Sequence, residues 1–115
     1  MNSVQSLISL IKTILEDHKA QNIVELDIKD VSSIADAMIV TSGTSTRHVK
    51  SMADAVMEKT KQAGFKILSS EGAQTSEWIL IDLADVIVHI MLPETRNFYD
   101  LERLWSARPQ DLQKA

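Results

Sequence analysis

Three histidines are the side chains in this sequence whose chemistry needs testing first. Histidine titrates near neutral pH and is a common metal ligand and acid–base catalyst, and the chain has His18, His48 and His89. No two of them have a metal-ligand spacing such as HxxxH, which places both rings on one face of a helix. The chain also has no cysteine, which excludes thiolate zinc sites, disulfides and cysteine nucleophiles. We therefore expect no metal site and no cofactor.

Two acidic residues provide an enzymatic alternative. Glu25 and Asp27 alternate on an expected strand and so point to one face, and nucleotidyl transferases use such a pair to hold two metal ions. In those enzymes a Gly-Ser type helix start precedes the acidic pair, whereas Gly43 and Thr44 follow it here. We expect a protein that is not an enzyme. The alternative is a degenerate nucleotidyl transferase that retains nucleotide or metal binding.

The segment SGTST, residues 42–46, lies between an expected strand and an expected helix. Backbone N–H groups at such a helix start can hold an anion. The segment has a single glycine, no following lysine and no Walker pattern. Capping of the helix by Ser or Thr explains its composition without a ligand.

The periodicity of apolar residues predicts the elements that position these side chains. Spacings of three and four predict helices, and strict alternation predicts strands. The expected order begins with a helix over 4–15 capped by Asn2 or Ser3, strands over 22–28 and 37–43, and a helix from Thr44 or Ser45 to Gly64. A short strand over 65–68, a polar loop over 69–77 and strands over 78–82 and 86–92 follow. The last element is a helix over 94–105 that carries Phe98, Leu101, Leu104 and Trp105. This order predicts one domain, residues 1–115, of the α/β (α+β) class, with a single mixed sheet of about five strands and flanking helices.

The two strands near the C-terminus form an expected hairpin whose faces differ in composition. A tight turn at DLAD makes Asp82 face Asp85 and Trp78 face His89. One face then carries only branched aliphatic residues, namely Ile79, Ile81, Val86, Val88 and Ile90; the other carries Trp78, Leu80, Ile87, His89 and Met91. The first set suits a core. The second has the composition of a surface that a partner covers, with His89 at a rim in contact with water.

The same hairpin has a second interpretation. Helices can cover both faces of a sheet, in which case His89 is a core histidine whose ring nitrogens have hydrogen-bond partners. The hairpin pattern alone does not separate the two interpretations.

Charge and hydropathy restrict the class of partner. The net charge is −4 and the pI is about 5.3, whereas proteins that neutralise phosphates usually have a basic surplus. We therefore expect little or no direct contact with nucleic acid. No apolar run approaches the length of a membrane span, and the N-terminal segment, with Glu16 and Asp17 but no basic leader, does not look like a targeting signal. A cytoplasmic location without membrane contact is expected.

Three motifs in order resemble those of a known family. They are DAMIVTSGTSTRHVKSMADAV, EGAQTSEWILIDLADVIVHIM and RNFYDLERLW, and together they span most of the chain. The chain resembles the ribosomal silencing factor family, also called the Iojap-like proteins. This resemblance implies a mixed sheet with flanking helices, distantly similar to nucleotidyl transferases but without their catalytic carboxylates.

The resemblance also implies a role and a partner. Its members repress translation when nutrients are short, by binding ribosomal protein L-fourteen on the large subunit and sterically blocking association with the small subunit. They also form homodimers. On this basis the face with Trp78, Leu80, Ile87, His89 and Met91 is the expected partner-binding surface. Its acidic edge includes Asp82, and Arg96 and Tyr99 are expected to border it.

This sequence departs from the family pattern at the hairpin. The family usually has a glycine-containing pair where this chain has Leu83 and Ala84. Without glycine, the favoured type I′ turn is costly because it needs positive φ angles. The register near Leu83 and Ala84, and with it the pairing of Trp78 with His89, therefore stays open.

Overall fold

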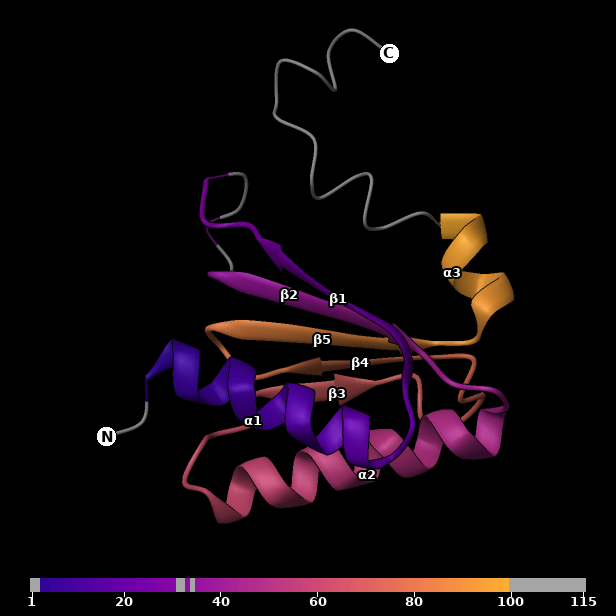
Figure 1. Cartoon of the computed structure of the whole chain (residues 1–115), viewed down its shortest axis with the longest axis horizontal. Coiled ribbons are helices and arrows are strands. Elements are labelled where there is room, and N and C mark those ends of the chain that lie inside the picture. The colour runs from indigo at the N-terminus through magenta and orange to yellow at the C-terminus, as the bar shows by residue number, and fades with distance from the viewer. Residues whose placement is uncertain (1–2, 31–32, 34, 100–115) are drawn as a thin grey trace, which may run out of the picture.

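Five strands form one mixed sheet, as predicted, in a computed structural model that describes residues 3–30, 33 and 35–99. The elements are α1 (Val4–Asp17), β1 (Gln21–Asp27), β2 (Ala37–Ser42), α2 (Thr46–Gln62), β3 (Ser69–Glu71), β4 (Trp78–Asp82), β5 (Val86–Met91) and α3 (Pro93–Tyr99). The expected helical residues Leu101, Leu104 and Trp105 lie outside the described residues. The α+β class with flanking helices is confirmed (Figure 1).

The strand order is β1-β2-β5-β4-β3. β2 and β5 pair in parallel at the centre, and every other neighbouring pair is antiparallel. A parallel pair needs a long crossover, and here the chain between β2 and β5 forms α2, β3 and β4. β1 and β3 are the two edges of the sheet.

The two long helices lie on the same face of the sheet (Figure 1). α1 begins at the cap residue Ser3, whose side chain accepts a hydrogen bond from the Ser6 N–H, and α2 begins at Ser45, which accepts from the His48 N–H in the same way. Both caps agree with the sequence prediction. In the described residues, no helix combines the length and apolar character needed to cross a membrane.

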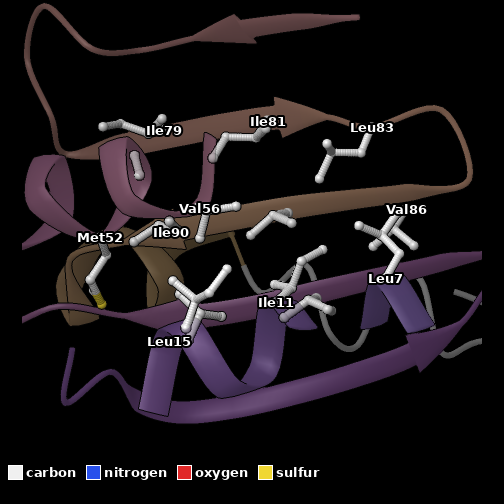
Figure 2. Packing of buried hydrophobic residues seen from close by; sticks show 14 of the residues in the cluster. Leu7, Ile11, Leu15, Met52, Val56, Ile79, Ile81, Leu83, Val86 and Ile90 are labelled. Atoms are coloured by element: carbon white, nitrogen blue, oxygen red, sulfur yellow. The ribbon is translucent and has the colours of Figure 1, made fainter. Parts of the chain in front are cut away.

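The main core lies between these helices and the sheet. Figure 2 shows aliphatic side chains from both helices and from β4 and β5 in one layer. Its buried residues include Leu7, Ile11 and Leu15 of α1, Val49, Met52 and Val56 of α2, and Ile79, Ile81, Val86, Val88 and Ile90 of the hairpin. The predicted core face of the hairpin is confirmed.

The stop of α2 corrects one sequence prediction. Gly64 has a φ of 94°, its N–H donates to the Lys61 carbonyl, and the Phe65 N–H donates to the Thr60 carbonyl. These two bonds form a Schellman motif, so Phe65 still belongs to the helix end. The predicted strand over 65–68 is wrong: the strand is Ser69–Glu71, in the segment predicted to be a polar loop.

The hairpin register corrects a second sequence prediction, the pairing of residues across the turn. Leu83 donates its N–H to the Val86 carbonyl, so Ala84 and Asp85 form the tip. Asp82 pairs with Ile87 and not with Asp85, and Trp78 pairs with Met91 and not with His89. The reason is burial: Leu83 is 3% exposed in the main core, a position it would lose at the tip. The shift is two residues, so every side chain keeps its predicted face.

Candidate functional site

The sheet face opposite α1 and α2 carries the predicted partner-binding residues. Trp78, Leu80, Asp82, Ile87, His89 and Met91, here called the Trp78 face, alternate with the core residues along β4 and β5. Met38 and Val40 of β2 lie beside them and join Met91, Ile28 and Ala35 in a second, smaller apolar cluster, against which Trp78, Ile87 and Leu26 pack. The face is therefore apolar across three central strands.

Burial within this face differs from the prediction. His89 is 5% exposed and Met91 is fully buried, so His89 does not stand at a wet rim. Trp78, Leu80, Asp82 and Ile87 are half-buried. Of the six residues of the Trp78 face, these four are thus the ones with exposed side-chain surface in the described structure.

Trp78 and His89 form a hydrogen-bonded aromatic pair. They are diagonal neighbours across the hairpin, because Trp78 pairs with Met91 and His89 with Leu80. The Trp78 Nε1–H donates to His89 Nδ1 over 2.8 Å, and the ring centroids lie 5.7 Å apart at an angle of 46°. An indole nitrogen can only donate, so Nδ1 of His89 is unprotonated and a neutral ring carries its proton on Nε2.

Burial keeps His89 neutral. Removal from water disfavours the imidazolium, and it lowers the pKa of His89 from 6.5 to about 4. The hydrogen bond from Trp78 needs the same neutral form. At neutral pH the pair therefore exists in a single protonation state.

The loop before β4 forms a cavity with Trp78. Glu71, Gly72, Trp78 and Leu80 line a volume of about 380 Å³. Gly72 has a φ of 96°, and a Cβ on it would collide with the Trp78 carbonyl oxygen, so only glycine allows the loop to approach β4 this closely. Glu71 and Gly72 were not predicted as site residues, because no apolar alternation marks β3; the EG…W motif was the available signal.

Arg96 joins α3 to the end of β2. It is buried, and its guanidinium donates to Ser42 Oγ over 3.1 Å. Ser42 pairs with Met91, which pairs with Trp78, so Arg96 lies near the same end of the Trp78 face. A second cavity of about 400 Å³ there is lined by Asn22, Val24, Ser42, Pro93, Arg96 and Asn97. Tyr99 ends α3, but its side chain lies outside the described residues.

The segment SGTST acts as a helix start. The Gly43 N–H donates to the Met91 carbonyl and the Thr44 N–H to His48 Nδ1. His48 Nε2 lies 2.7 Å from the His18 carbonyl oxygen, so this ring connects the start of α2 to the end of α1. His48 and His89 thus have separate structural contacts, on different faces of the sheet.

The acidic pair lies on the helix side of the sheet. Glu25 forms a 3.2 Å ion pair with Lys12, and Asp27 accepts the Lys29 backbone N–H. Both line a cavity of about 110 Å³ with residues of α1. Among residues 3–30, 33 and 35–99, no three His, Cys, Asp or Glu side chains gather in a group that could hold a metal ion.

These features define a small α+β protein whose two long helices cover one sheet face and whose other face carries an apolar surface that includes Trp78. The whole chain, residues 1–115, matches the family described as ribosomal silencing factor during starvation. The chain belongs to this family. Membership makes it a regulatory factor that acts in translational silencing at the ribosome.

Similar proteins and a solved structure support this family membership. A ribosomal silencing factor from Chromobacterium violaceum is 44% identical over 105 residues, covering 91% of this chain and 86% of that protein. One from Haemophilus influenzae is 42% identical and covers 88% and 99%. A crystal structure of a C. violaceum protein superposes with a TM-score of 0.90 at 43% identity, covering 93% of this chain and 89% of the other.

Proposed function

We propose that this protein represses translation by binding the large ribosomal subunit through ribosomal protein L-fourteen. Bound there, it sterically prevents association with the small subunit. This proposal refines the family's silencing role into one partner and one mechanism. It needs no catalysis, only a surface that docks firmly. A mouse relative, 31% identical over 94% of this chain and 49% of its own length, is named for mitochondrial assembly of the ribosomal large subunit, which favours the large subunit here.

The observation that carries the proposal is the half-buried Trp78 on a largely apolar sheet face. Tryptophan is among the residues that contribute most to protein interfaces, because one side chain supplies a large area and needs few rotamers to be fixed. Leu80 and Ile87 extend the apolar area beside it. Glu71 and Asp82 add acidic groups on the same face, which suits a basic ribosomal protein through charge complementarity.

A second copy of the chain could use the same surface. The described part of the chain has one face with this composition, so homodimerisation and subunit binding would compete for Trp78. We propose that the protein works in the cytoplasm, and that its contact with the ribosome is made to protein rather than to ribosomal RNA, because the net charge is −4.

Co-sedimentation with purified large and small subunits tests the function. We expect the wild type to sediment with the large subunit only. Trp78→Ala should weaken that binding about 30-fold, the factor that corresponds to roughly 2 kcal/mol lost at an interface hot spot. The same variant should restore joining of the small subunit in a reassociation assay.

Leu68→Ala is the matched control. Leu68 is apolar and 54% exposed, but it lies at the sheet edge beside β3, outside the Trp78 face. Its truncation should leave binding unchanged. Large-subunit binding that ignores Trp78 would exclude this surface and keep the function. Absence of binding to either subunit would refute the function itself.

A further inference from the structure

His89 is too deeply buried to serve as a contact residue, although it lies in the middle of the Trp78 face. Its side chain and backbone together expose 5% of their surface. Its side chain binds Trp78 on this face, through the 2.8 Å hydrogen bond and the tilted ring pair. His89 is therefore suited to act on a partner through Trp78.

We infer that His89 is a positioning residue that holds the Trp78 indole in its binding orientation, so that a protein partner meets the ring and not the N–H. This inference rests on the proposed function for its binding part. The indole has a single donor, and His89 Nδ1 occupies it. The partner group that fits is accordingly an apolar or cationic side chain against the ring, and not a hydrogen-bond acceptor for the indole.

The position of Trp78 is set at both its main chain and its side chain. Gly72 approaches the Trp78 carbonyl so closely that no Cβ would fit. His89 then holds the far end of the side chain, diagonally across the hairpin. A ring fixed before binding loses less conformational entropy on association than a free one. Removal of the hydrogen bond should therefore weaken binding about two- to tenfold, less than removal of the ring.

Other charged groups around His89 must be considered in the test. The charged residues on the Trp78 face are Asp82 of β4, Glu71 of β3 and Arg96 of α3. The described residues that β2 and β1 place on this face are uncharged, namely Met38, Val40, Ser42, Asn22, Val24 and Leu26. Asp82 pairs with Ile87, adjacent to His89 on this face. The effect of the Asp82 and Glu71 carboxylates should be measured alongside, in His89 variants that keep both carboxylates and lack the imidazole.

The experiment compares His89→Asn with His89→Leu in the full chain. Asparagine places an amide oxygen near the Nδ1 position and can still accept from the indole; leucine cannot. The first readout is the ¹H–¹⁵N resonance of the Trp78 indole, identified by its disappearance in Trp78→Phe. We expect slow hydrogen exchange of this group in the wild type and His89→Asn, and fast exchange in His89→Leu. On acidification the wild-type resonance should shift with a midpoint near pH 4, by more than any shift that the carboxylates cause in His89→Leu.

The second readout is affinity for the large subunit. We expect His89→Asn within about twofold of the wild type, His89→Leu two- to tenfold weaker, and Trp78→Phe closer to wild type than Trp78→Ala. Unchanged indole exchange in His89→Leu would overturn the inference. Equal losses in both His89 variants would also overturn it, because they would indicate a general packing role. Equal losses in Trp78→Phe and Trp78→Ala would show that the partner reads the N–H.

The two proposals fail separately. If the wild type binds neither subunit, the proposed function is refuted, while indole exchange still decides whether His89 holds Trp78. If the wild type binds and His89→Leu binds equally well with a mobile indole, the function stands and the positioning role is refuted.

Discussion

At the scale of single residues, His89 links the free energy of unfolding to pH. Its pKa is about 4 in the fold and near 6.5 in an unfolded chain. Between these values the unfolded chain binds the proton more strongly, so acid favours unfolding. The stability contribution of the neutral ring is complete above pH 6.5 and is lost as the pH falls towards 4.

We expect this loss to reach about 2–3 kcal/mol near pH 4, at roughly 1.4 kcal/mol for each pKa unit. Urea unfolding of the wild type and His89→Leu between pH 7.5 and 4 measures it. Carboxylates titrate in both proteins, so the difference between the two curves isolates His89. Parallel curves across this range would contradict the assignment.

The residue types of the site were predictable, but the contact between them was not. Aromatic residues and histidines are few in this chain, so Trp78 and His89 on one hairpin face were recognisable as candidate site residues. Their hydrogen bond depends on a diagonal relation across the hairpin, which changes with register. His89 lies between Val40 of β2 and Leu80 of β4, and no local sequence pattern reports that β2 is its neighbour.

At the scale of elements, the hairpin tip is under backbone strain. Ala84 has a φ of 70°, in the left-handed region that disfavours residues with a Cβ. The Asp85 N–H donates to the Leu83 carbonyl around it, and the Ala84 N–H donates to Asp82 Oδ1. These two bonds, with the burial of Leu83, hold Ala84 in its costly conformation. The missing glycine is thus compensated within the tip.

Ala84→Gly should therefore stabilise the protein by about 0.5–1 kcal/mol, because relief of strain exceeds the added freedom of the unfolded chain. Thermal unfolding should show a midpoint several degrees higher. The same substitution at Ala55, inside α2, is the control and should destabilise by about 1 kcal/mol. A lower midpoint for Ala84→Gly would show that the tip bonds, and not the φ angle, dominate.

Helices and strands with clear periodicity were predicted well, and β3 was not. α1, α2 and β4 each bury one face or stripe, and β5 is an almost fully buried apolar run, so burial left a pattern in their sequence. Ser69–Glu71 is exposed along its whole length. It is a strand only because its backbone pairs with β4 at the sheet edge, and such pairing leaves no trace in polar side chains.

At the scale of the whole molecule, the helices determine which sheet face is available. Both α1 and α2 cover the aliphatic face (Figure 1), although amphipathic helices of this kind could have been placed on either side. The strand order likewise depends on the whole molecule. β2 and β5 are far apart in the sequence and pair only at the centre of the finished sheet. Sequence periodicity and composition identified the core face of the hairpin, but they could not say whether helices would cover the other face as well.

One consequence follows for mutation along the hairpin. A saturation scan scored separately for thermal stability and for large-subunit binding should show the two scores alternating from one codon to the next. Ile79 and Ile81 should affect stability, and Trp78, Leu80 and Ile87 mainly binding. His89 and Met91 should affect both, since they are buried on the binding side. Two scores that rise and fall together would contradict the separation of the faces. Adjacent positions in the gene are therefore exposed to different kinds of selection.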